Sequence, residues 1–115
     1  MEISTLHEGG FCIIAINGEL DASSSILLDR AISGVVSKNE PNILIDCKNL
    51  SYISSAGLGV FMSYLQDFQD SNISLVLFGL NEKVTNVFEI LGLDQLLTIV
   101  FSKEEAKSLV NDPLL

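Results

Sequence analysis

Histidine is almost absent from this sequence, which contains one, His7, together with two cysteines and no tryptophan. A single histidine excludes metal sites built from several histidines, and it leaves any histidine-based catalytic triad dependent on one residue near the N-terminus. Cys12 and Cys47 each lie in or beside a strand-like apolar run, and neither belongs to a Cys-x-x-Cys or Cys/His pattern. We therefore expect two structural thiols and no bound metal or cofactor.

Basic residues are also scarce, with 6 Lys and Arg against 15 Asp and Glu and a net charge of −9. Nucleic acid and anionic lipid are bound mainly through Lys and Arg that neutralise phosphates, so both repel an acidic chain. The longest apolar runs, such as residues 11–16, are too short to span a bilayer, and residues 1–4 lack the basic start of a secretory signal. The sequence therefore predicts a cytoplasmic protein with no direct nucleic-acid contact and no membrane insertion.

Apolar residues make up 48% of the chain and charged residues 18%, which is typical of a globular protein. Since no repeat or linker interrupts the chain, we expect one domain over residues 1–115. Gly9 and Gly10 separate the first two apolar runs and predict a hairpin. The strands predicted from apolar runs are 3–8, 11–17, 42–46, 74–78 and 96–101.

Helical spacing predicts four helices between or after those strands: one after residues 23–25, one over 55–70, one from an Asn81 cap to Gly92, and one after a Ser102–Glu105 capping pattern. Alternating strands and helices indicate an α/β fold, in which crossovers make most strand pairs parallel. We expect a mixed, mostly parallel central sheet of four to five strands with about four helices. The apolar positions are Leu27, Leu28, Ala31, Ile32, Val35 and Val36 in the first helix, and Ala106, Leu109 and Val110 in the last.

Two adjacent serines, Ser54 and Ser55, stand directly before the second helical pattern. Either suits an N-cap, because a serine oxygen can accept a hydrogen bond from one of the free amides that open a helix. Gly57 and Gly59 follow in the first turn, where each glycine costs about 1 kcal/mol of helix stability relative to alanine. We interpret the two glycines as backbone kept bare for a partner, and a helix start also favours a bound or covalent phosphate.

The second predicted helix has two different sides. One side carries large apolar residues and must face the sheet. The opposite side is small and uncharged as far as Asp67, and it either docks a partner or packs against a neighbouring helix. The sheet-facing residues are Leu58, Phe61, Met62, Leu65 and Phe68, and the small ones are Ala56, Gly59, Val60 and Ser63.

Enzymatic sites fit this stretch poorly. A phosphate-binding P-loop requires a Gly-Lys-Ser/Thr ending, yet residues 49–81 contain no Lys or Arg. A nucleophile elbow requires Gly-x-Ser-x-Gly, but an isoleucine takes the first glycine place of the Ser55 register, and His7 is the single candidate base. Asp21 and Asp46 follow or end predicted strands and could hold Mg²⁺, although simple loop capping explains them as well. We predict a protein that is not an enzyme.

Four motifs resemble the STAS domain, specifically bacterial anti-sigma-factor antagonists, and together they cover nearly the whole chain. The resemblance implies partner switching, in which the unphosphorylated antagonist binds an anti-sigma factor that is also a serine kinase, so that sigma is released. Phosphorylation by that kinase ends the interaction, and a phosphoserine phosphatase restores it. The motifs are Gly-Glu-Leu-Asp at 18–21, Ile-Leu-Ile-Asp at 43–46, Tyr-Ile-Ser-Ser-Ala-Gly-Leu-Gly at 52–59 and Gly-Leu-Asp-Gln-Leu-Leu at 92–97.

The resemblance places the phosphoacceptor on Ser55 and, as the second choice, on Ser54, which occupies the family's acidic position. Asp21 matches the acidic residue that the family places beside the acceptor loop. Two other functions stay open: a constitutive STAS scaffold, for instance an accessory subunit of a transporter, in which the serines only cap, and a small hydrolase that uses Ser55 and His7. The residues predicted to bind the partner are Asp21, Ser54, Ala56, Gly57, Gly59, Val60 and Ser63.

Overall fold

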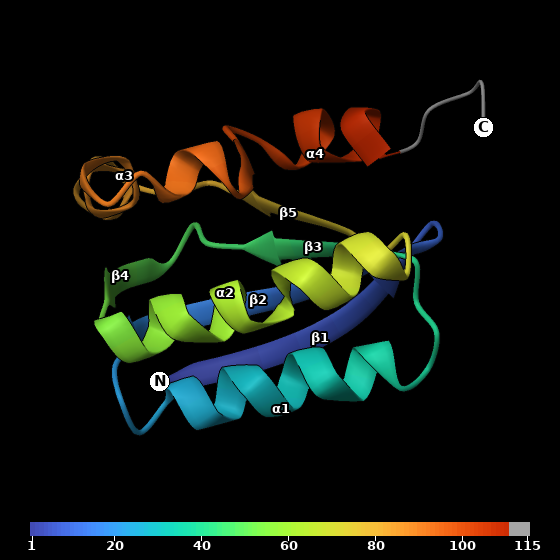
Figure 1. Cartoon of the computed structure of the whole chain (residues 1–115), viewed down its shortest axis with the longest axis horizontal. Coiled ribbons are helices and arrows are strands. Elements are labelled where there is room, and N and C mark those ends of the chain that lie inside the picture. Colours follow the sequence, from blue (N-terminus) through green and yellow to red (C-terminus); the bar gives the residue numbers. More distant parts are fainter. Residues whose placement is uncertain (111–115) are drawn as a thin grey trace.

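The structure, a computed structural model, describes residues 1–110 and has a central sheet with helices on both faces (Figure 1). α1 (Ser25–Val36), α2 (Ser55–Asp70) and α3 (Glu82–Ile90) pack on one face in the larger of two apolar clusters. On the other face, α4 (Lys103–Val110) packs through Ala106. Residues 111–115 lie outside the described part, as does the side chain of Val110, so the prediction of one domain over 1–115 stays a prediction.

The first two strands form the predicted hairpin. β1 (Glu2–Glu8) pairs antiparallel with β2 (Phe11–Leu20) in continuous register from Glu2 opposite Asn17 to Glu8 opposite Phe11. Gly9 and Gly10 connect them with φ angles of +56° and +86°. Positive φ at both central residues defines the turn that matches the twist of paired strands, and glycine adopts it without steric cost.

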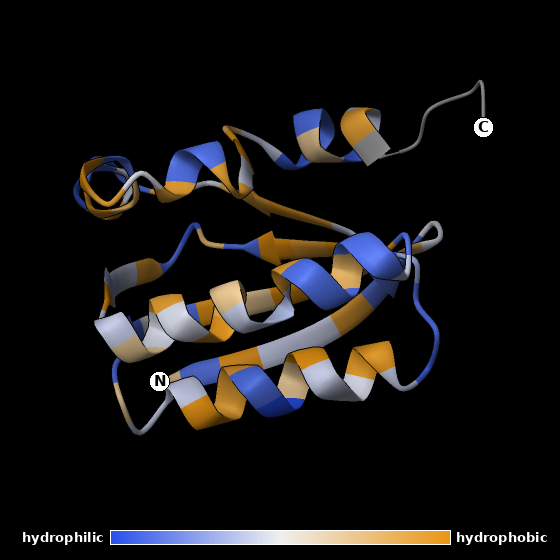
Figure 2. Ribbon diagram, in the orientation of Figure 1, coloured by the Kyte–Doolittle hydropathy of each residue, from blue (hydrophilic) through white to orange (hydrophobic). Residues whose placement is uncertain are grey.

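The remaining strands are parallel to β2 and confirm the mixed, mostly parallel α/β sheet. The main path runs β1-β2-β3-β5-β6, with β3 (Asn42–Asp46), β5 (Ser74–Phe78) and β6 (Thr98–Val100). β3 and β5 are apolar along most of their length, as strands buried on both faces should be (Figure 2). The sheet has six strands rather than four to five, because β4 (Leu50–Ile53) was not predicted.

β4 pairs with the second half of β2, off the main path of the sheet. β2 leaves β3 after Ala15 and meets β4 from Gly18 onward, with a register shift between Gly18 and Glu19. Gly18 has a φ of +113°, a conformation that side chains rarely adopt, and such irregularities bend a strand. The bend carries the end of β2 toward β4 and so sets the position of the functional stretch.

Several helical predictions are confirmed at residue level, and others need correction. α2 spans the predicted residues, and Asn81 caps α3 as expected. Leu27 does not belong to the buried face of α1, since it is 45% exposed and lies one residue away from the row of Leu28, Ile32 and Val35. The last strand is shorter than the predicted range 96–101, because the 3-10 helix η1 (Leu93–Gln95) directly precedes it. Leu96 and Phe101, at the two ends of the predicted range, are exposed. Leu109 of α4, predicted to be an apolar position of the helix, is also exposed.

Both cysteines are buried, as predicted. Cys12 in β2 and Cys47 directly after β3 have no exposed surface, and both are free thiols. Burial raises the pKa of each thiol, since the charged thiolate is poorly solvated there. These thiols therefore serve packing in the sheet. Separately, within residues 1–110 no helix combines the length and apolar character needed to cross a membrane.

Candidate functional site

The site lies where β2 and β4 end side by side. Leu20 pairs with Ile53 at the last position of both strands, and the Ser54 N–H donates to the Leu20 carbonyl at 2.9 Å. Parallel strands bring their carboxyl ends to one edge of the sheet, which is where open α/β folds place their sites. Asp21 and the serine pair, predicted separately from sequence, are thereby brought to the same edge. Figure 1 shows the end of β4 leading into the start of α2 at this edge.

The two serines have different structural roles. Ser54 is the N-cap of α2, with an extended backbone, and its Oγ accepts a hydrogen bond from the Gly57 N–H at 3.3 Å. Ser55 is the first residue of the helix and is exposed. Capping by Ser54 satisfies one free amide and leaves the Ser55 hydroxyl available at the surface. The structure thus decides which of the two serines caps the helix.

The side of α2 that carries the small residues is largely exposed to solvent. Ala56, Gly59 and Ser63 are exposed, and Val60 is half-buried against the core. The alternative interpretation, in which a neighbouring helix covers this side, is therefore wrong for the three exposed residues. An uncharged strip extends from Ser55 along the first two turns of the helix, and it is free to contact another protein.

Gly57 corrects the interpretation of the two glycines. It is buried, and a Cβ atom at this position would lie 2.8 Å from both Cγ and Cδ2 of Leu20 and 3.1 Å from Cγ1 of Ile53. The prediction that Gly57 offers bare backbone to a partner is therefore wrong. The side of Gly57 where another residue would carry its Cβ packs against Leu20 of β2 and Ile53 of β4. At Gly59 a Cβ would meet no atom within 4 Å, so that backbone does face outward.

Asp21 holds the start of α1 beside the serine pair. Its Oδ1 accepts hydrogen bonds from the N–H groups of Ser23 at 3.1 Å and Ser24 at 3.0 Å, and from the Ser23 hydroxyl at 2.9 Å. The Ser24 hydroxyl accepts in return from the Asp21 N–H at 2.8 Å. These bonds, with the Ser24 amide as the largest contributor, lower the pKa of Asp21 to about 2. Asp21 is therefore a fixed negative charge at this edge.

The buried Ser24 and the side-chain contacts of Leu20 with Gly57 were not predicted as parts of the site. The Asp-x-Ser-Ser order at 21–24 is a recognisable signal for such a turn, because aspartate side chains bond the backbone two or three residues on. No comparable signal marks Leu20, whose partner Gly57 is distant in the chain.

We expect Asp21→Asn to lose stability at neutral pH and to lose progressively less as the pH falls. The folded-state pKa of about 2 is below the ordinary value of about 3.9, so the carboxylate stabilises the fold above pH 4 and this contribution disappears as the pH falls toward 2. Urea denaturation of both proteins between pH 6 and pH 2.5 measures the difference. The same substitution at the exposed Asp67 controls for the general loss of a carboxylate, and a constant Asp21→Asn difference across the range would contradict the assignment.

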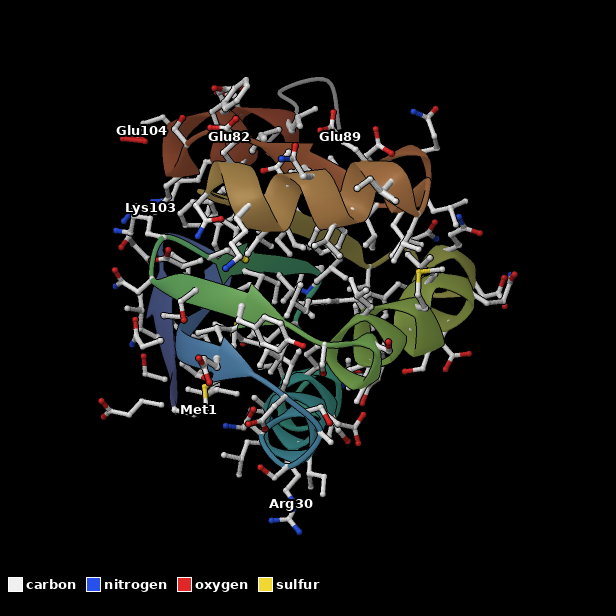
Figure 3. All side chains as sticks on the ribbon, turned by 90° about the vertical axis from the view of Figure 1, so that its left-hand side faces the viewer. Met1, Arg30, Glu82, Glu89, Lys103 and Glu104 are labelled. Atoms are coloured by element: carbon white, nitrogen blue, oxygen red, sulfur yellow. The ribbon has the colours of Figure 1, made fainter. Side chains whose placement is uncertain are left out.

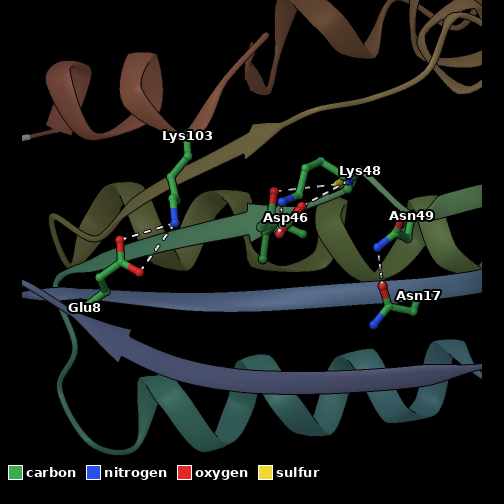
Figure 4. A network of polar contacts seen from close by, with 8 residues as sticks. Glu8, Asn17, Asp46, Lys48, Asn49 and Lys103 are labelled. Atoms are coloured by element: carbon green, nitrogen blue, oxygen red, sulfur yellow. Dashed lines mark hydrogen bonds and ion pairs between the residues drawn. The ribbon is translucent and has the colours of Figure 1, made fainter.

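Asp46 does not join Asp21. At the end of β3 its Oδ1 accepts from the Lys48 N–H at 3.1 Å, and its Oδ2 lies 3.6 Å from the Lys48 Nζ (Figure 4). It therefore has a local cationic partner. Within residues 1–110, no three or more His, Cys, Asp or Glu side chains come together as a metal ion would require. The Mg²⁺ alternative therefore finds no support in the described residues.

His7 cannot act as a base for Ser55. It pairs with Cys12 at the start of β2, whereas Ser55 lies beyond the far end of that strand, next to Leu20. Leu20 is eight positions after Cys12, which corresponds to roughly 26 Å along a strand. The His7 Nε2 lies instead 3.0 Å from a Glu40 carboxylate oxygen. The hydrolase alternative is therefore wrong in the form that pairs these two residues.

Comparison with known proteins identifies the family. A family model described as the STAS domain matches residues 2–106. The chain belongs to the STAS domain family. The STAS fold explains why the ends of β2 and β4 and the start of α2 form one edge, and the resemblance noted in the sequence motifs is confirmed.

Named relatives of this STAS protein are anti-sigma factor antagonists. An "Anti-sigma-B factor antagonist" of Listeria monocytogenes is 34% identical over 86 residues, covering 75% of each protein. One of the same name from Staphylococcus aureus is 26% identical over 99 residues, covering 86% of this chain and 92% of the relative.

Solved structures share the fold. An anti-sigma factor antagonist from Mycobacterium paratuberculosis has a TM-score of 0.86 at 21% identity, covering 96% of both chains. The Bacillus cell fate determinant SpoIIAA in its phosphorylated form has a TM-score of 0.71 at 20% identity, covering 95% of this chain and 99% of that one. At these identities the likeness establishes the STAS fold.

Proposed function

We propose that this STAS protein is an anti-sigma factor antagonist whose binding is switched by phosphorylation of Ser55. One observation carries the proposal: Ser55 is the exposed first residue of α2, and Ser54 performs the capping. A serine that capped the helix would have to break that bond to react, whereas Ser55 is available without any rearrangement. Relatives named as anti-sigma-B factor antagonists support the class of function.

The partner of the unphosphorylated protein is an anti-sigma factor that is also a serine kinase, and the complex forms in the cytoplasm. It contacts the uncharged strip of α2, namely Ala56, Gly59, Val60 and Ser63, with Asp21 and Ser54 beside it. A phosphoserine phosphatase removes the phosphate and restores binding. The existence of a phosphorylated form of SpoIIAA, which shares this fold, supports a covalent switch.

The electrostatics of the site favour a phosphate that leaves the fold intact. A phosphate adds about −1.5 to −2 charges, and at the first turn of α2 it meets the free amides and positive end of the helix dipole. Residues 49–81 contain no Lys or Arg, and the chain already carries a net charge of −9. The added charge therefore acts on the partner, because an apolar or acidic contact surface would lose affinity for this strip.

Phosphate mapping tests the acceptor. Incubation of the protein with its cognate kinase and Mg-ATP should add one phosphate, which tandem mass spectrometry places on Ser55. Ser55→Ala should accept none, whereas Ser54→Ala should still be phosphorylated while losing about 0.5–2 kcal/mol of stability with its cap. Phosphate found only on Ser54, or normal modification of Ser55→Ala, would overturn the assignment. A protein that accepts no phosphate but still binds its partner would favour a constitutive scaffold.

A further inference from the structure

A second surface lies between α3 and β6, the edge strand on the opposite side of the sheet from β1. It contains a hollow of about 180 Å³, which we call the α3–β6 hollow. Its lining is mostly apolar, from Leu80 after β5, Phe88 of α3, Ile99 of β6 and Phe101 directly after β6. A dry apolar cavity of roughly 150 Å³ accepts a benzene-sized group, so the hollow can hold one leucine or phenylalanine side chain.

Large apolar side chains that line the hollow remain exposed or half-buried. Phe101 is 89% exposed, and Leu80, Ile99 and Val100, which line the hollow with it, are half-buried. Phe101 contributes little to the fold, because it buries almost none of its surface. Single exposed apolar residues are normal, but a group of accessible ones that lines a hollow marks an interaction site.

The rim of the hollow is acidic. Glu89 of α3 and Asp94 of η1 line it, and Glu82 lies seven positions before Glu89, on the same side of α3. Figure 3 shows Glu82, Glu89 and Glu104 along one outer side of the molecule, over α3 and α4. Carboxylates around an apolar hollow favour a ligand that is apolar in the middle and positive at its edges.

Nearby basic residues do not neutralise this rim. Lys103 and Lys107 of α4 both pair with Glu8 of β1, and the Lys103–Glu8 contact measures 3.3 Å (Figure 4). The basic residue of α3 is Lys83. It follows Glu82 directly and so lies about 100° around the helix axis from Glu82, away from the side that carries Glu82 and Glu89. No basic side chain lines the hollow itself among the described residues.

We propose that the α3–β6 hollow docks a segment of a partner protein that inserts one leucine or phenylalanine and carries Lys or Arg on both sides of it. The apolar side chain fills the hollow against Phe88 and Phe101, and the basic residues pair with Glu89 and Asp94. A second copy of the chain is disfavoured as the occupant, because two molecules of charge −9 repel each other.

The hollow is distinct from the Ser55 site. Both lie toward the carboxyl ends of parallel strands, and β4, which leads to Ser55, contacts the start of α3 through the Asn81 side chain, which donates to the Leu50 carbonyl at 3.2 Å. However, no residue of β4 or α2 lines the hollow. Docking in the hollow therefore goes beyond the phosphorylation switch and should not depend on Ser55.

A titration of the ¹⁵N-labelled protein with a synthetic 11-residue peptide, one phenylalanine flanked by lysines in an alanine and serine background, tests the proposal. We expect saturable shifts at Thr85, Phe88 and Phe101, with at least tenfold weaker binding for Phe101→Ser and for Glu89→Lys. Ser55→Glu should bind the peptide as the wild type does. Neither rim substitution should unfold the protein, because both side chains are exposed.

Matched controls separate the hollow from general attraction between opposite charges. Ile26→Ser removes a 54% exposed apolar side chain on α1, and Asp70→Lys reverses an exposed charge at the end of α2. Both should leave peptide affinity within twofold. Equal losses in the controls, shifts spread over the whole surface, or concentration-dependent dimerisation that Phe101→Ser abolishes would overturn the proposal. Loss of peptide binding in Ser55→Glu would overturn the independence of the two surfaces.

Discussion

Replacing Ser55 by glutamate should lower the affinity of this STAS protein for its anti-sigma partner at least tenfold, which is about 1.4 kcal/mol. The substitution places a carboxylate at the exposed first position of α2, beside the fixed charge of Asp21. In the complex this charge would be desolvated or would meet a like charge, and either costs free energy. Isothermal titration calorimetry of the purified pair measures the affinity.

Two variants show whether charge is the cause. Ser55→Gln has nearly the size of the glutamate variant without its charge, and should lose much less affinity. Ser4→Glu adds the same charge to an exposed residue of β1 and should bind normally. If Ser55→Gln loses as much affinity as Ser55→Glu, side-chain volume rather than charge controls binding, and unchanged affinity in Ser55→Glu would contradict the electrostatic switch.

Gly57→Ala should destabilise the protein by about 1–2 kcal/mol, even though alanine is the better helix former. The new methyl group would lie 2.8 Å from Leu20, a fully buried side chain that cannot turn aside into solvent, and 3.1 Å from the buried Ile53. Overpacking of a filled core costs typically 1–3 kcal/mol, more than the 0.5–1 kcal/mol that alanine gains over glycine in a helix. Urea denaturation followed by circular dichroism measures the change.

Gly59→Ala is the matched control two residues further along the same helix. Its methyl group would meet nothing within 4 Å, so only the helix preference remains. We expect a gain in stability of about 0.5–1 kcal/mol. Opposite signs for the two substitutions would support the packing difference; the same sign for both would show that Leu20 and Ile53 can move aside.

Helices and strands with a strong and continuous pattern of apolar residues could be predicted from the sequence. α2 spans 55–70 as expected, because large apolar residues recur at helical spacing behind a capping serine. β3 and β5 also match their predicted bounds, since each is an apolar run closed by turn residues. β4 was missed because four residues with two exposed in the middle carry too short a pattern. Its existence depends on the bend at Gly18, which is a property of β2.

In the site, too, local sequence patterns predict some features and others depend on contacts between distant parts of the chain. Gly57 and Gly59 look equivalent in the sequence, and their difference comes from Leu20, which reaches Gly57 only after β2 and β4 have paired. Ser54 and Ser55 are likewise both chemically suited to capping, and only the backbone at the start of α2 distinguishes them. Local patterns therefore located the site, and tertiary contacts assigned its residues their roles.

The burial of both cysteines has a practical consequence for site-directed spectroscopy. Maleimide reagents attack the thiolate, and burial keeps Cys12 and Cys47 protonated and out of reach. A single new cysteine at an exposed position outside both sites, such as Ile90→Cys, should therefore accept a fluorophore or spin label selectively in the otherwise natural chain. Distance and mobility measurements on the two surfaces can proceed without first removing the native thiols.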